Sequence, residues 1–173
     1  MRNYFLGLCL LFALCFTACS HSDDSVDVLI IGGGASGVTA GIQSARMGAA
    51  TLIVEETEWL GGMLTSAGVS AVDGNYDLPA GLFGEFREHL ADYYGGLDSL
   101  KTGWVSAVLF EPSVGNKIFH EMVDAEKNLK VWHNATLVKL EREKDVWIAQ
   151  IQMKDNTIKK IHAKILIDGT ELG

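Results

Sequence analysis

Three glycines near the start of the chain stand at the spacing G-x-G-x-x-G, as Gly32, Gly34 and Gly37. The first would allow a tight turn after a strand, the second would let a diphosphate approach the backbone, and the third would let a helix pack closely on that strand. Free N–H groups at the start of the helix would attract the anion. The predicted contacts are Gly32, Gly33, Gly34, Ala35, Ser36 and Gly37.

An acidic residue lies at the distance that this chemistry requires. Glu55 follows Gly32 by 23 residues and ends a short apolar run. A carboxylate at this spacing accepts hydrogen bonds from ribose hydroxyls, and it would repel a 2′-phosphate, which disfavours NADP. The competing interpretation is a glycine-rich turn that holds no ligand, next to an ordinary surface Glu.

The elements that must position these residues form a βαβ unit. Val26–Ile31 reads as a buried strand, Ala35–Met47 as a helix and Thr51–Val54 as a second buried strand. Residues 57–79 read as a long loop, and amphipathic helices are predicted at Ala80–Tyr94 and Ser113–Ala125. Further strands are predicted at 131–133, 135–141, 146–153, 157–162 and 163–167. The expected fold class is α/β, a Rossmann-like domain whose parallel sheet starts with the βαβ unit, plus a small β-meander.

The first residues are predicted to be a targeting segment. Tyr4–Phe16 is an almost unbroken apolar run of 13 residues, long enough for a signal peptide and too short to span a membrane. Thr17, Ala18 and Cys19 follow, an order that resembles the cleavage site of bacterial lipoproteins. We expect a signal peptide at 1–18, lipidation at Cys19, a polar tether at 19–25 and one domain at 26–173. An ordinary signal peptide with a chance Cys is the alternative.

Composition excludes several classes of function. The formal net charge of −8 argues against a nucleic-acid partner. All three cysteines, Cys9, Cys15 and Cys19, fall in or at the end of the leader, so the mature chain has no internal disulfide and no redox-active Cys pair. The five histidines show no ligand spacing, and no metal is expected.

A resemblance to a known family extends these inferences. VDVLIIGGGASGVTAGIQSARMGAATLIVEETEWLGGMLTSAG, residues 26–68, resembles the opening of glutathione-reductase-type FAD oxidoreductases, above all the group called FAD-dependent oxidoreductases. The resemblance implies that Gly61, Gly62 and Met63 pass close to the cofactor. It also implies a place at the adenosine for Glu56, which stands where a basic residue is common.

Later segments carry the same resemblance over nearly all of residues 26–173. NATLVKL resembles the segment whose backbone faces adenine, which implies a contact at Leu137. ILIDGTELG resembles a strand and loop near the nucleotide, which implies contacts at Asp168 and Thr170. An Asp usually follows the position of Gly173 in the family, so we expect the FAD-binding domain to be incomplete at this end.

The favoured function is therefore the FAD-binding part of a flavin-dependent oxidoreductase that acts on an unknown small organic substrate. It would be exported and held on a bacterial membrane by its lipid anchor alone. One alternative is a truncated, non-enzymatic nucleotide-binding lipoprotein. Another is an NAD-binding dehydrogenase domain, against which the run Leu60–Met63 and the inserted helices argue.

Overall fold

The computed structural model of the chain describes residues 24–74, 76–78, 80–104 and 106–171. The predicted signal peptide and Cys19 lie outside the described residues. The first strand, β1 (Asp24–Ile31), begins two residues before the predicted Val26. Asp24 and Ser25 were assigned to the tether, but they pair with Ile161 and His162 of the last strand, which extends β1 toward its N-terminus.

A parallel sheet forms the centre of the fold. β2 (Thr51–Glu55) pairs with β1 on one side and with β3 (Leu129–His133) on the other, both in parallel. The last strand, β6 (Ile158–Asp168), pairs in parallel with the free side of β1. Within the described residues six strands share one sheet in the order β3-β2-β1-β6-β5-β4. The predicted α/β class with a βαβ start is confirmed.

The helix of the βαβ unit is α2 (Ala35–Arg46), which ends one residue before the predicted Met47. Gly41 lies on its sheet side, where a methyl group would stand 2.6 Å from Cδ1 of Ile53. The small residue therefore brings the helix axis close to β2. Gly48 follows with a φ of 90°, a left-handed conformation that reverses the chain toward β2 without strain.

An antiparallel meander follows the parallel strands. β4 (Thr136–Glu143) pairs with β5 (Val146–Gln152), and β5 pairs with β6. The prediction of two strands at 157–162 and 163–167 was wrong, because a single strand runs through both segments. Ile158–Ala163 pairs antiparallel with β5, and from Asp24 onward β1 takes the other edge of the same strand.

The long connection between β2 and β3 supplies the remaining helices. It contains the short 3-10 helices η2 (Gly62–Leu64) and η3 (Leu97–Leu100), and the α-helices α3 (Gly81–Tyr94) and α4 (Pro112–Asp124). Both α-helices match their predicted ranges to within a residue. Phe86 of α3 stacks on Phe119 of α4 with ring centroids 4.5 Å apart, which joins the two helices in one core.

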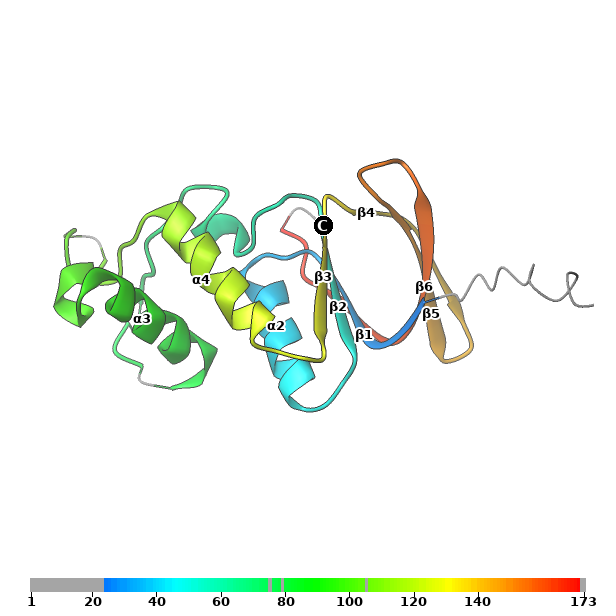
Figure 1. Cartoon of the computed structure of the whole chain (residues 1–173), viewed down its shortest axis with the longest axis horizontal. Helices are drawn as coiled ribbons and strands as arrows, with labels where there is room; N and C mark the ends of the chain where they lie inside the picture. Colours follow the sequence, from blue (N-terminus) through cyan, green and yellow to red (C-terminus); the bar gives the residue numbers. More distant parts are fainter. Residues whose placement is uncertain (1–23, 75, 79, 105, 172–173) are drawn as a thin grey trace, which may run out of the picture.

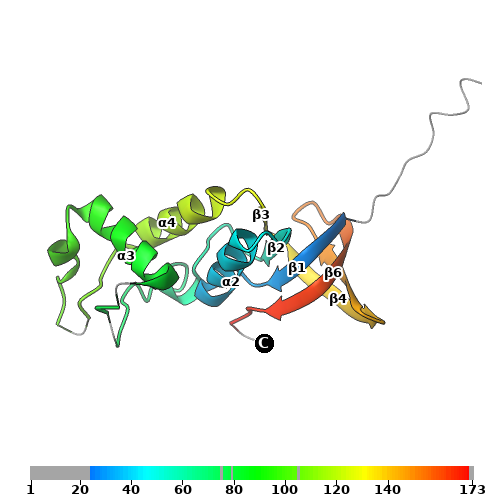
Figure 2. The ribbon, with the colours of Figure 1, turned by 90° about the horizontal axis from the view of Figure 1, so that it is seen from below.

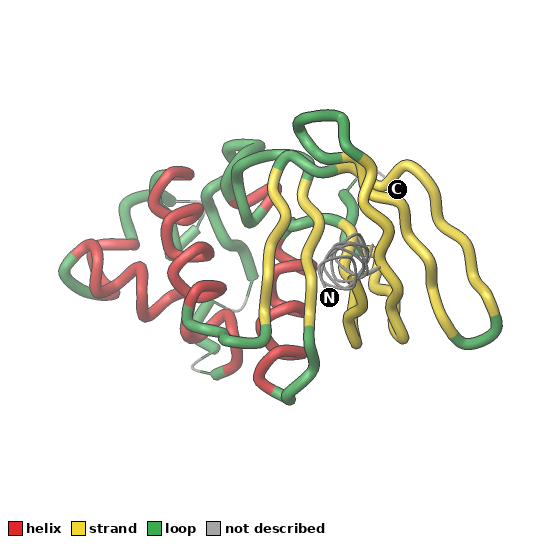
Figure 3. Tube along the Cα trace, turned by 45° about the vertical axis from the view of Figure 1, so that its right-hand side comes forward, coloured by secondary structure: helices red, strands yellow, loops and turns green. Residues whose placement is uncertain are grey.

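The sheet separates two apolar cores. Helices α2, α3 and α4 lie on one side of the parallel strands, and the β4–β5 hairpin lies on the other (Figures 1 and 2). Along β1, Ile30 packs into the core on the helix side while its neighbour Leu29 packs into the core beneath the hairpin. Both side chains are fully buried, as expected for a central strand covered on both faces. Figure 3 shows the β4–β5 hairpin at one end of the sheet.

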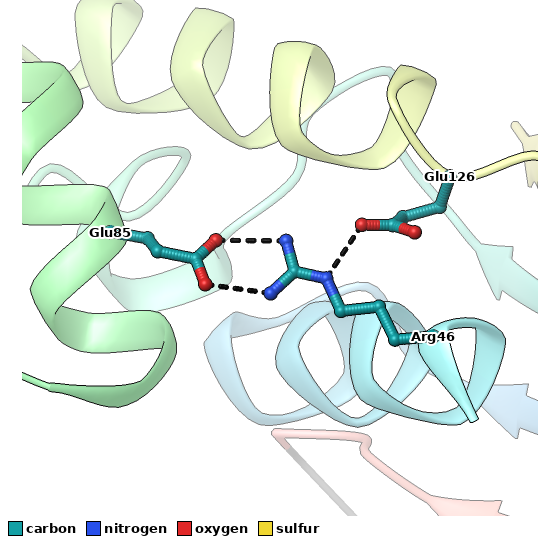
Figure 4. A network of polar contacts seen from close by, with 3 residues as sticks. All are labelled: Arg46, Glu85 and Glu126. Atoms are coloured by element: carbon teal, nitrogen blue, oxygen red, sulfur yellow. Dashed lines mark hydrogen bonds and ion pairs between the residues drawn. The ribbon is translucent and has the colours of Figure 1, made fainter.

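A guanidinium group holds the inserted helix against the βαβ unit. Arg46, the last residue of α2, donates two hydrogen bonds to the carboxylate of Glu85 on α3, at 2.7 and 2.8 Å (Figure 4). Its Nε donates a third, at 2.7 Å, to Glu126 after α4. One side chain therefore connects α2 to α3 and to the segment that follows α4. The described residues include no helix that is long and apolar enough to cross a membrane.

Candidate functional site

The turn between β1 and α2 is shaped by two glycines at which a side chain would force the neighbouring backbone to move. Gly32 has a φ of 96°, and a Cβ there would lie 2.5 Å from the carbonyl oxygen of Gly169. A Cβ on Gly37 would overlap the carbonyl oxygen of Gly32. The end of β6 packs on this turn, because Gly169 donates its N–H to the Ile31 carbonyl at 2.7 Å. These glycines bring three backbone segments together.

Gly34 serves a different purpose. It precedes α2 with φ −63° and ψ 177°, an extended conformation open to any residue, and no side chain caps the helix there. The first N–H groups of an α-helix have no acceptor within the helix, so they can meet a ligand. The absence of a Cβ at Gly34 therefore matters for what approaches it and not for its backbone conformation.

The predicted ribose acid lies beside this turn. Glu55 ends β2, and its Oε2 accepts a hydrogen bond from the Gly33 N–H at 2.7 Å. Its Oε1 accepts hydrogen bonds from the N–H and the hydroxyl of Thr57, both at 2.8 Å. The hydrogen bonds from Gly33 and Thr57 hold the Glu55 carboxylate in place. Its oxygen atoms can still accept further hydrogen bonds.

A cavity of about 620 Å³ runs along these residues. Its apolar lining comes from the strands on both sides of the turn: Ile31, Val54, Ala135, Leu137, Leu140 and Leu166. Four carboxylates line it as well: Glu55, Glu56, Asp168 and Glu171. The described residues place no Lys or Arg in this lining. An anion in this cavity would therefore rely on peptide N–H groups and on the start of α2.

Asp168 is fixed by its own turn. Its Oδ1 accepts hydrogen bonds from the hydroxyl of Thr170 at 2.7 Å and from the N–H of Thr170 at 3.0 Å. The hydroxyl first, and then the backbone N–H, holds the pKa of the Asp168 carboxyl below its ordinary value. Asp168 is therefore an anion at neutral pH, and the loop after β6 keeps a fixed shape beside the cavity.

The second glycine pair lies close to Glu171 at the end of this loop. Gly61 and Gly62 have φ values of 102° and 49°. A Cβ on Gly61 would press into the ring of Phe119, whereas Gly62 lines the cavity. Gly61 donates its N–H to the Gly33 carbonyl at 2.8 Å, which holds the loop against the start of α2. Only Gly62 of this pair keeps the space open.

The structure brings most of the predicted residues to one place. The predicted residues that line the cavity are Gly32, Gly34, Glu55, Glu56, Gly62, Leu137, Asp168 and Thr170. The others, Gly33, Ala35, Ser36, Gly37, Gly61 and Met63, support that lining from the adjoining backbone. Met63 exposes 57% of its surface and contributes its peptide N–H, which donates to Glu171.

Several lining residues were missed. They are Ile31, Val54, Thr57, Ser66, Ala135, Leu140, Leu166 and Glu171. Ile31 and Val54 could have been found, because they end the two strands that lead into the predicted site. Leu140 and Leu166 carry no local signal, since only the pairing of the strands shows that they lie near the turn. Among the described residues no group of three or more His, Cys, Asp or Glu could hold a metal ion.

Fold and site together define a dinucleotide-binding domain of the Rossmann type. A model of the family described as FAD dependent oxidoreductase matches residues 27–173. The chain belongs to this family, and FAD is therefore its cofactor. A search of the curated proteins finds no match.

Solved structures share the fold. A flavoprotein/dehydrogenase from Cytophaga hutchinsonii superposes with a TM-score of 0.60 and 16% identity over 84% of this chain and 39% of its own. The myxobacterial chondrochloren halogenase, a variant of the FAD-dependent halogenases, gives 0.60 and 12% over 85% of this chain and 37% of its own. The bacillithiol disulfide reductase of Bacillus cereus gives 0.58 and 13% over 84% and 39%. The chain spans well under half the length of each.

Proposed function

We propose that the cavity holds FAD and that the chain is the FAD-binding part of an oxidoreductase acting on a small organic substrate. The diphosphate would lie at the Gly32–Gly37 turn, the adenosine ribose at Glu55 and the adenine beside Leu137. The observation that carries this proposal is the single continuous cavity that joins these three places.

The residues present fit the dinucleotide in size and in chemistry. A volume of about 620 Å³ lies within the range of cofactor pockets. The apolar wall formed by Leu137, Leu140 and Leu166 suits a planar base. The uncapped start of α2 suits a diphosphate, because it offers N–H groups and the positive end of the helix dipole.

Each part of the chain would have a distinct role in binding. The carboxylate of Glu55, fixed by Gly33 and Thr57, would accept hydrogen bonds from the ribose hydroxyls and repel a phosphorylated ribose. Glu56 would add a second negative charge at the same end. FAD, when bound, supplies the electron-transfer chemistry, and the protein binds it and orients it toward the substrate.

We also propose that the protein is exported and anchored by a lipid at Cys19, after removal of residues 1–18. The apolar run Tyr4–Phe16 and the small residues before Cys19 support this. Several acyl chains on one cysteine would give stable attachment, which a single chain does not. The polar residues that follow would separate the domain at 26–173 from the membrane.

The cofactor proposal is tested by titrating the purified full chain with FAD and, separately, with NAD. Quenching of flavin fluorescence and a rise in the melting temperature with FAD are expected, with no response to NAD. A folded chain that responds to neither would contradict the cofactor proposal. A response to NAD alone would support the dehydrogenase alternative.

A further inference from the structure

An acidic side chain of the protein lies where the cofactor's diphosphate is expected. Oε1 of Glu171 accepts a hydrogen bond from the peptide N–H of Met63 at 2.9 Å. The same atom stands over both glycines that keep this part of the cavity open. A Cβ on Gly34 would lie 2.8 Å from it, and a Cβ on Gly62 would overlap it.

The Glu171 carboxylate occupies a seat formed by Gly34, Gly62 and the N–H of Met63. Hydrogen bonds hold the backbone around this seat. Gly61 is bonded to the Gly33 carbonyl at 2.8 Å, and an isolated parallel bridge joins Gly34 to Gly61. The hydroxyl of Thr65 donates to the Leu60 carbonyl at 2.6 Å from a buried position. Two glycine segments are thus held at a fixed separation, and the Glu171 carboxylate lies between them.

No side-chain cation explains why the carboxylate rests there. Among the described residues the cavity lining contains no Lys or Arg, and the hydrogen bond to Glu171 comes from a peptide group. The features that hold this anion are an N–H group, the start of α2 and the lack of side chains at Gly34 and Gly62. The same features would recognise a diphosphate.

We propose that Glu171 is an internal competitor for the diphosphate position, which must leave its seat before the dinucleotide binds fully. This inference rests on the proposed function. Glu171 is exposed to solvent, and it follows the fixed Asp168–Thr170 turn, so its side chain can rotate away while the backbone stays in place. Without a dinucleotide, the Glu171 carboxylate would then occupy the diphosphate position. A ligand would displace it only by binding the seat more tightly.

The first test is the FAD affinity of Glu171→Ala in the full chain. Because apparent affinity falls with the fraction of molecules whose site is blocked, removal of the carboxylate should lower the Kd by about three- to tenfold. The gain should lie in a faster association. Glu88→Ala, which removes an exposed acid on α3, is the matched control and should leave the Kd unchanged. Weaker binding by Glu171→Ala would overturn the proposal, because it would make Glu171 a ligand of the cofactor.

A second measurement follows the hydrogen bond between the Met63 N–H and Glu171. The amide resonance of Met63 should shift in Glu171→Ala, and saturating FAD should shift it in the wild type, because the bond to Glu171 is lost in both. An unchanged Met63 resonance in the FAD complex would contradict displacement. If the folded chain binds no FAD, the proposed function fails, and inorganic diphosphate becomes the probe. Tighter binding of diphosphate to Glu171→Ala than to wild type would uphold the competitor, and equal binding would reject it.

Discussion

Arg46 and Glu85 meet across the gap between α2 and α3 through two parallel N–H···O bonds of 2.7 and 2.8 Å. Planar, bidentate pairs of this kind are stronger and more directional than pairs that involve Lys. Glu126 approaches the same guanidinium at 2.7 Å. The inserted helices are therefore tied to the helix that starts at the glycine turn.

Substitution of Arg46 by Ala should lower the free energy of unfolding by about 1 kcal/mol, since both side chains of the main pair remain about one-third exposed. Urea unfolding at pH 7 measures this loss. Lys117→Ala is the matched control, because its pair with Glu121 is 3.6 Å long and more than half exposed. Equal stability of the Arg46 variant and the wild type would show that the pair contributes nothing.

The same contact predicts a dependence on pH. The hydrogen bond from Arg46 holds the pKa of Glu85 below its ordinary value. A lowered carboxyl pKa contributes stability that is complete above the unfolded-state pKa, about 4.3, and is lost as the pH falls through the folded-state pKa. The difference between wild type and Arg46→Ala should therefore be constant from pH 5 to 8 and shrink toward zero below about pH 4. A difference that grows on acidification would contradict this account.

Two substitutions in the glycine motif should separate folding from binding. Gly37→Ala places a methyl group on the Gly32 carbonyl oxygen, and it should cost about 1–3 kcal/mol of stability. Gly34→Ala is compatible with its backbone conformation and meets only the movable end of Glu171, so the melting temperature should hardly change. Its methyl group should still keep the diphosphate away and raise the FAD Kd at least about tenfold. Equal thermal destabilisation by both variants would refute the distinction.

Glu55→Gln tests the ribose contact. The amide can still accept from Gly33 or Thr57, but it offers no charge to the ribose hydroxyls, so FAD should bind about tenfold more weakly. FMN, which lacks the adenosine, is the matched ligand, and its affinity should not change. A similar loss of FMN affinity would show that Glu55→Gln disturbs the structure of the glycine turn and does not act at the ribose alone.

Lipidation at Cys19 predicts that the protein partitions with membranes and that Cys19→Ser releases it into the aqueous fraction. Mass spectrometry of the N-terminal peptide should show an acylated Cys19 as the first residue. An N-terminus further along the chain, with no lipid, would support the ordinary signal peptide instead.

Local patterns predicted the elements that depend on neighbouring residues. The βαβ unit followed from two apolar runs around the glycines, and α3 and α4 followed from their apolar periodicity. Glu55 was found because its spacing from Gly32 is set by one helix and one strand. These features are encoded within short stretches of chain.

Features that depend on distant pairing were missed. β6 was divided into two strands, because the change from polar to apolar residues near Ala163 marks a change of partner and not a turn. Glu171 gave no local sign of its place, since Gly34, Gly62 and Met63 come to it from elsewhere in the chain. The apolar wall was incomplete for the same reason.

The position of β6 between β1 and β5 sets an order in which the sheet can form. Asp24 pairs with Ile161 and Ile31 pairs with Asp168, so that edge of β1 stays open until β6 is present. Until residues 161–168 are present, β1 has a row of unpaired peptide groups on that side, as any open edge does. Leu166, Asp168 and Glu171 arrive with this last strand and its loop. The chain thus gains the second neighbour of β1 and this wall of the cavity together.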